Sequence, residues 1–363
     1  MNRLEASSVL RGARALHSSG HKFAALDGIR GLAAIAVMMR HTSSMWGFPL
    51  VHSHLAVDVF FLLSGFVIAS SYEAKLADRR LSFGAFVKLR LIRFYPMYLV
   101  ALALGIWLAW ITGVTNGEPV SHRDVLALGA LALFFIPSAG AGILPLLSVS
   151  WSLFYELVVN ILYAATRPAL STRMLLAISG AAYLALAAAA IQHGSLDMGW
   201  AGSLLGVAEG LTRSIFGIFL GIALFRLRAR LATLLPTIPP LAAIVAICLL
   251  VFAPPLGPTW ILDVIALTLL PPLVLAAARS EPPFARTMFF LGSASYPVYL
   301  LHIPLHVAFG LAVDVRAWAP WSGLVFAIGT VLIAVAAERA YDLPVRRWLT
   351  AALRPRAEPV KTA

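Results

Sequence analysis

The stretch LDGIRGLAAIAVMMRHTSSMW, residues 26–46, decides the fold of this chain. A helix needs about 20 mainly apolar residues to cross the hydrocarbon core of a bilayer, and this stretch has that length. Apolar segments of comparable length recur along the 363-residue chain. We therefore predict an all-α membrane bundle of about ten helices. The predicted spans are 26–46, 54–71, 91–112, 149–166, 174–191, 205–225, 238–253, 259–278, 289–311 and 320–340.

The composition excludes most classes of soluble protein. Hydrophobic residues make up 60% of the chain and charged residues only 12%, whereas soluble domains are about half apolar and one quarter charged. The single cysteine, Cys248, lies inside an apolar run, so a disulfide scaffold is excluded as well. A net charge of +12 would suggest nucleic-acid binding in a soluble protein, but these basic residues lie between apolar runs. We expect a lipid bilayer around the chain and no nucleic acid as a partner.

The basic segments orient the predicted helices. Basic loops stay in the cytosol, so we expect both termini to be cytosolic and the number of crossings to be even. The shorter apolar segment 124–137 would make that number odd, and we interpret it as a re-entrant or interfacial helix on the outer side. We divide the chain into a cytosolic tail (1–22), a transmembrane domain (23–350) and a second cytosolic tail (351–363). The basic segments are the two termini, 75–93, 167–173, 226–230 and 279–286.

Two ionisable residues share one face of the first predicted helix. Arg30 and His41 are eleven residues apart, which brings them within about 20° of one direction and about 16 Å apart along the axis. A histidine at mid-membrane depth is a candidate for proton transfer, so we favour a functional role for both residues. The alternative is a structural pair of Arg30 with Asp27. For the neighbouring Arg40 we favour snorkelling towards the interface.

Asp58 lies near the outer end of the second predicted span, at the depth of His41. It could orient the imidazole of His41, as an acid does beside the base of many hydrolytic and transfer sites. A carboxylate near a helix N-terminus is also favoured by the macrodipole alone. The spacing does not separate these two interpretations.

Three cations begin the third predicted span, FVKLRLIRFYPMYLV. Arg90 and Arg93 lie one turn apart on one helix face, with Lys88 close by. Such a cluster could bind a cytosolic phosphate-bearing ligand. The positive-inside rule accounts for the charge as well, and we lean towards binding because the pair precedes Tyr95 and Pro96.

Two later helices carry polar stripes that should face a hydrated cavity, because polar side chains are costly in lipid. The helical pair His302 and His306 lacks an HExxH motif or a cysteine cluster, so we expect no metal. The stripes consist of Ser152, Glu156, Asn160 and Tyr163, and of Ser295, Tyr299, His302 and His306.

Five motifs in this order resemble the acyltransferase-3 family of integral membrane acyltransferases, and the resemblance extends from about Leu26 to Arg347. The first motif is LDGIRGLAA, in which ten residues separate Arg30 from His41 further along the chain. The others are VDVFFLLSGF (57–66), the pair Arg90 and Arg93, WSLFYE (151–156) and LGSASYPVYLLH (291–302).

The resemblance implies an enzyme that takes an acyl group from cytosolic acyl-CoA and gives it to a hydroxyl of a sugar or related acceptor. The family's key arginine and histidine map onto Arg30 and His41, and its cytosolic basic pair maps onto Arg90 and Arg93. We therefore predict an O-acyltransferase, most simply an acetyltransferase, in a bacterial cytoplasmic membrane. Acetyl-CoA is the expected co-substrate, with no permanently bound cofactor.

The closing family pattern appears as Asp342, Pro344 and Arg346. Glutamate is usual at the first position, which argues against a direct role for Asp342. Some family members carry an extracytoplasmic hydrolase-like domain for the final transfer. We expect this chain either to transfer directly or to work with a separate extracytoplasmic transferase.

The predicted roles follow from these features. His41 would be a general base or an acyl carrier, with Arg30 beside the acyl path, and Asp58 and Glu156 would orient His41 or the acceptor. The donor site would contain Lys88, Arg90 and Arg93, and the acceptor cavity Trp151, Ser152, Asn160, Tyr299 and His302. A transporter or flippase of a sugar-like solute is the alternative, because polar stripes also line solute paths, and an acyl-CoA sensor without turnover is a weaker third option.

Overall fold

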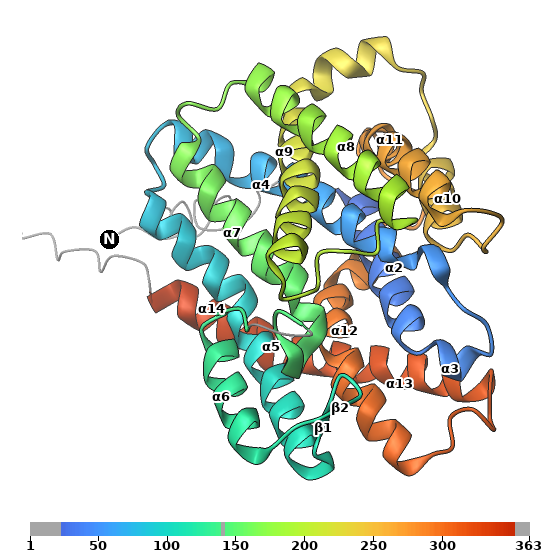
Figure 1. Cartoon of the computed structure of the whole chain (residues 1–363). Coiled ribbons are helices and arrows are strands. Elements are labelled where there is room, and N and C mark those ends of the chain that lie inside the picture. Colours follow the sequence, from blue (N-terminus) through green and yellow to red (C-terminus); the bar gives the residue numbers. More distant parts are fainter. Residues whose placement is uncertain (1–22, 139–141, 353–363) are drawn as a thin grey trace, which may run out of the picture.

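The computed structural model describes residues 23–138 and 142–352, and these residues form a bundle of helices (Figure 1). The all-α prediction is confirmed, with one two-stranded hairpin, β1 (Val114–Thr115) and β2 (Glu118–Pro119), in the described part of the chain. Residues 1–22 and 353–363, which include nearly all of both predicted tails, lie outside the described ranges.

Each of the ten predicted spans contains a helix. The helices in these spans are α2 (Ala24–His41), α4 (Leu55–Ala77), α5 (Phe83–Thr112), α7 (Trp151–Thr166), α8 (Thr172–His193), α9 (Leu204–Leu234), α10 (Pro240–Val251), α11 (Thr259–Ala277), α12 (Ala285–Ala312) and α13 (Trp321–Ala337). The shorter elements are α3 (Ser43–Trp46), η1 (Val51–His54), α6 (His122–Leu133), η2 (Pro145–Ser150), η3 (Glu338–Asp342) and α14 (Leu343–Ala352).

Within the described ranges, seven helical stretches are long and apolar enough to cross a membrane. The chain is therefore a multi-pass membrane protein. Helices α2, α9 and α10 are not among the seven. Helix α2 contains three charged residues and α10 has only 12 residues, so the count of ten and the cytosolic termini stay predictions.

Glycines allow the helices to pack closely. A side chain at Gly221 of α9 would begin 2.2 Å from the backbone oxygen of Leu62 in α4, and one at Gly65 would begin 2.0 Å from the oxygen of Ile218. Backbones can approach this closely only where small residues face each other. The spacing of Gly217 and Gly221 indicates such packing in the sequence, and the structure confirms it.

Helix α6 runs along only half of α5. His122 at its start stacks on Trp110, with ring centroids 4.2 Å apart, and Tyr98 donates a hydrogen bond of 2.7 Å to the carbonyl of Ala132 near its end. The chain then reverses at Phe135, whose φ is +54°. A helix of 12 residues is about 18 Å long, which is shorter than the hydrocarbon core of about 30 Å. The interpretation of this segment as a re-entrant or interfacial helix stays a prediction.

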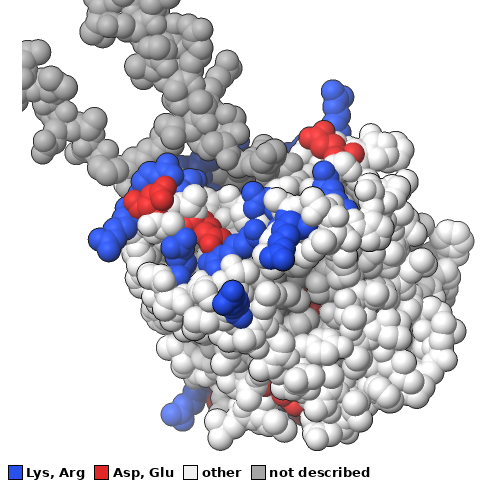
Figure 2. Space-filling model, turned by 90° about the horizontal axis from the view of Figure 1, so that it is seen from above, with Lys and Arg blue, Asp and Glu red and all other residues white. Residues whose placement is uncertain are grey.

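The positive charge is concentrated near one end of the bundle. Glu73 of α4 binds Arg226 of α9 at 2.6 Å and lies 3.8 Å from Arg167, which follows α7. The ends of three helices that are followed by basic segments therefore meet. Figure 2 shows lysines and arginines gathered over one part of the upper face, while most of the rest of that face is uncharged. The positive-inside rule predicts that this end is cytosolic.

Candidate active site

A cavity of about 130 Å³, which we call the inner cavity, lies among α2, α4, α5, α7 and α12. Phe60, Phe61 and Phe94 make part of its wall apolar. Its lining also contains three arginines and one carboxylate, so cations outnumber anions there. The polar lining residues are Arg30, Ser64, Arg90, Arg93, Ser152, Glu156, Ser295, Tyr296 and Tyr299.

Glu156 is held on the inner cavity by two donors. Arg90 donates to its Oε1 over 2.8 Å, and the Ser64 hydroxyl donates to the same oxygen over 2.5 Å. Arg90 also lies over the ring of Phe94, 4.7 Å from the centroid. The structure therefore does not place Glu156 beside His41, because its carboxylate is engaged by α4 and α5 at the inner cavity.

The other two arginines of the inner cavity differ in their partners. Arg30 forms the ion pair with Asp27 that we considered as an alternative, with a distance of 2.6 Å, and still lines the cavity. Arg93 lies over the ring of Tyr296, 4.8 Å from its centroid. In the described ranges no carboxylate lies within 4.0 Å of the Arg93 guanidinium, although the buried carboxylate of Asp342 interacts with its charge at longer range. Lys88 is exposed and does not line the cavity.

A second, larger cavity of about 770 Å³, which we call the outer cavity, has His41 in its wall. Its wall is built from α2, η1, the turn of the β hairpin, η2 and the segment before α9. Arg40 of this wall pairs with Asp197 and donates to the carbonyl of Val51 over 2.8 Å, so its guanidinium has protein partners. The polar and aromatic lining includes Arg40, His41, His54, Asn116, Glu118, Trp151, Asp197, Trp200, Arg213 and Tyr299.

The partner of His41 is His302, not Asp58. Nδ1 of His41 lies 3.0 Å from Nε2 of His302, and the two rings stack with an interplanar angle of 22°. His302 is fully buried and its own Nδ1 lies 3.1 Å from the carbonyl oxygen of Val298. It therefore lies behind His41 and does not line the cavity itself, while His306 packs against Phe326.

Asp58 forms a buried, two-pronged pair with Arg213. The guanidinium donates to Oδ1 over 3.1 Å and to Oδ2 over 2.6 Å, and it also donates to the carbonyl of Met198 over 2.7 Å. Both side chains are at most 3% exposed. The expected contact between Asp58 and His41 is thus not formed, because Arg213 occupies both carboxylate oxygens. Arg213 is visible in the sequence as a charge inside an apolar span, but its partner is not.

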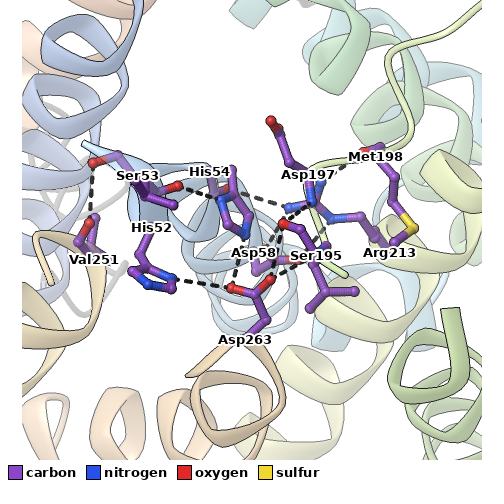
Figure 3. Close-up of polar contacts among 12 residues, drawn as sticks. His52, Ser53, His54, Asp58, Ser195, Asp197, Met198, Arg213, Val251 and Asp263 are labelled. Carbon is purple, nitrogen blue, oxygen red and sulfur yellow. Dashed lines mark hydrogen bonds and ion pairs between the residues drawn. The ribbon is translucent and has the colours of Figure 1, made fainter. Parts of the chain in front are cut away.

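A second buried cluster was missed by the sequence analysis (Figure 3). Asp263 of α11 lies 3.0 Å from Nε2 of His54 and 3.5 Å from Nδ1 of His52. Its other oxygen accepts from Ser195 over 3.2 Å and from the backbone of Leu196 over 2.8 Å. The signal in the sequence is a single acid inside the apolar run TWILDVIALTLL. The cluster ties η1, α11 and the segment before α9 together beside the outer cavity.

Tyr299 lines both cavities and stands where they meet. Its hydroxyl donates to the carbonyl of Val149 over 2.9 Å. With that proton committed, it accepts from Ser152, 2.7 Å away. Its ring packs edge-on against Phe60 of the inner cavity. The phenol therefore separates the arginine-lined space from the space that contains His41.

The remaining predicted residues lie apart from the cavities. Asn160 is fully buried and lines neither of them, and in the described ranges its amide has no hydrogen-bond partner. Asp342 is also fully buried and pairs with Arg346 at 2.6 Å beside α5. No group of three metal-ligating side chains is positioned to hold an ion in residues 23–138 and 142–352.

Comparison with known proteins decides the family. A family model described as an acyltransferase domain matches residues 23–339. The chain belongs to the acyltransferase-3 family. This membrane acyltransferase transfers groups other than aminoacyl groups. The chain is also 40% identical over 187 residues to "Protein 2 in picA locus" of Rhizobium radiobacter. The matched region covers 47% of this chain and 97% of that protein. No solved structure matches the chain significantly.

Proposed function

We propose that this acyltransferase moves an acetyl group from cytosolic acetyl-CoA to a hydroxyl of a carbohydrate or glycan acceptor, in a bacterial cytoplasmic membrane. The observation that carries the proposal is the pair of cavities that meet at Tyr299. One is lined by arginines and the other contains His41, so donor and acceptor would approach the reaction from opposite ends of the bundle.

The inner cavity suits the donor. The phosphates of CoA are anionic, and guanidinium groups bind phosphate through paired hydrogen bonds. Arg93 supports this role best, because in the described ranges no carboxylate forms an ion pair with it, whereas Arg30 and Arg90 are each paired. A space of about 130 Å³ is too small for the whole donor, so the nucleotide would lie at the basic end of the bundle with its phosphates at Arg93, while the acyl end would extend inward past Arg30.

The outer cavity suits a polyhydroxylated acceptor. Its volume of about 770 Å³ is within the range of small-molecule sites. Trp151 and Trp200 offer flat apolar surfaces to sugar rings, and Asn116, Glu118 and Asp197 offer hydrogen-bond acceptors. Arg40 pairs with Asp197 and Arg213 pairs with Asp58, so in the described lining Glu118 is the charge without an ion-pair partner, which disfavours an anionic acceptor.

His41 would carry the chemistry as a general base or as an acyl carrier. As a base, it takes the proton of the acceptor hydroxyl while that oxygen bonds to the thioester carbon. The carbon–sulfur bond breaks, and the proton passes from His41 to the departing thiolate. As a carrier, the imidazole nitrogen bonds to the acetyl carbon while the carbon–sulfur bond breaks and CoA leaves as the thiolate. The acceptor oxygen then takes the acetyl group as the carbon–nitrogen bond breaks, and the hydroxyl proton passes through the imidazole to the thiolate. In both cases the acyl group must pass Tyr299.

A transporter of a sugar-like solute without acyl transfer is not favoured, because the family is one of acyltransferases. A separate extracytoplasmic transferase as the final acceptor of the acyl group is compatible with the same site. In that case the outer cavity would face a protein hydroxyl instead of a glycan.

Variants of His41 and Arg30 test the proposal. We expect His41→Ala and Arg30→Ala proteins, inserted normally in the membrane, to lose acetylation of the glycan. His306→Ala is the matched control, because His306 is on the helix of His302 but lines neither cavity. Acetylation at the native rate by the His41→Ala and Arg30→Ala proteins would refute the proposed function.

A further inference from the structure

We propose that His302 is a positioning residue that fixes the tautomer of His41 and leaves Nε2 of His41 as the reactive nitrogen. This inference rests on the proposed role of His41. The observation behind it is a chain of two hydrogen bonds from a backbone carbonyl to the histidine of the outer cavity.

The backbone fixes the first link of this chain. Nδ1 of His302 lies 3.1 Å from the carbonyl oxygen of Val298, one helical turn earlier. A carbonyl oxygen only accepts hydrogen bonds, so Nδ1 of His302 carries the hydrogen. In a neutral imidazole the second nitrogen is then an acceptor.

Burial keeps His302 neutral. Its side chain is fully buried on α12. Its polar contacts in the described part of the chain are the backbone of Val298 and Tyr299 and the ring of His41, and no carboxylate is within ion-pair distance. An imidazolium without a counter-charge is costly in such a place. Nε2 of His302 is therefore a lone-pair acceptor.

The second link sets His41. Its Nδ1 is 3.0 Å from Nε2 of His302, so Nδ1 of His41 donates to that acceptor. The backbone of Val37, one turn earlier in α2, is a further hydrogen-bond partner of His41. This leaves Nε2 of His41 without a hydrogen. The His41 side chain is exposed and lines the outer cavity, and the stacked arrangement of the rings holds its orientation. A basic nitrogen is thus directed away from the bundle core without any acid as the orienting group.

Two substitutions at one position test this role. His302→Leu fills the site but cannot accept a hydrogen bond, whereas the carboxamide oxygen of His302→Gln can accept from Nδ1 of His41. We expect the Leu variant to lose about 10²-fold or more in kcat, the range of general acid–base effects, with the KM for acetyl-CoA unchanged. We expect the Gln variant to recover most of that loss. Equal losses in both variants, or native kcat in the Leu variant, would overturn the inference.

Nitrogen-15 NMR of histidine-labelled protein measures the tautomer directly. In the wild-type protein we expect His41 to show a protonated Nδ1 and an unprotonated Nε2, a result that does not depend on whether either variant folds. A protonated Nε2 on His41 would contradict the inference. The His41→Ala variant separates the two proposals. Activity in that variant refutes the function proposed for His41, whereas native kcat in His302→Leu refutes only the positioning role of His302.

Discussion

Arg90 donates a hydrogen bond of 2.8 Å to Glu156, across 66 positions of sequence, and both side chains line the inner cavity. This pair neutralises one of the three arginines there. Arg30 is paired with Asp27, so in residues 23–138 and 142–352 Arg93 is the arginine of the inner cavity that forms no ion pair, and we propose that it binds the anionic donor.

Arg93→Gln should weaken donor binding. A hydrogen bond to a charged group contributes about 1.5–3 kcal/mol, so we expect the KM for acetyl-CoA to rise about tenfold or more, with little change in the KM for the acceptor. Lys88→Gln is the matched control, because Lys88 is exposed and does not line the cavity. Initial rates at varied acetyl-CoA would measure both variants, and equal effects of the two substitutions would contradict the assignment.

Glu156→Ala should act on the donor side. The carboxylate positions Arg90 and Ser64, neither of which lines the outer cavity. We expect a change in the KM for acetyl-CoA and no change in the KM for the acceptor, measured in separate titrations of the two substrates. A changed KM for the acceptor with an unchanged KM for acetyl-CoA would instead support the role predicted from the sequence, in which Glu156 orients His41 or the acceptor.

Asp58→Ala should lower the free energy of unfolding of the protein, because Asp58 pairs with the buried Arg213. Removing one partner of a buried ion pair costs about 3–5 kcal/mol, because the other charge stays buried. Thermal unfolding in detergent measures the loss. The double variant Asp58→Leu with Arg213→Met should be more stable than Asp58→Ala, since apolar replacements of a whole buried pair are tolerated. A double variant that is no more stable would show that the pair is not the main contribution of Asp58.

Tyr299→Ala should connect the two cavities. The phenol touches Phe60 on the inner side, and its hydroxyl is held by Ser152 and Val149. Without it, water from the outer cavity would reach the thioester. We expect release of CoA in the absence of acceptor to rise, as followed with a thiol reagent. Unchanged background release would show that Tyr299 does not separate donor from water.

Much of the fold follows from the sequence because apolar length and helical period are local properties. The eleven-residue spacing of Arg30 and His41 already places one face of α2 along both cavities. Charge between the spans likewise indicates which end of the bundle is basic.

The partners of the site residues are not local and could not be predicted. His41 meets His302 across 261 positions and Asp58 meets Arg213 across 155. Asp58 is an example, because it lies at the depth of His41 on a neighbouring helix and is therefore a reasonable partner for it. The sequence does not show that α9 is rotated so that Arg213 meets Asp58 instead. Asp263 could have been found as an ionisable residue in an apolar span.

The most direct test of the account uses sealed proteoliposomes with labelled acetyl-CoA on the side of the basic loops and a glycan acceptor on the other side. We predict that the label appears on the glycan with the wild-type protein and that His41→Ala leaves the glycan unlabelled. Unmodified sugar crossing the membrane while no label reaches the glycan would contradict the account.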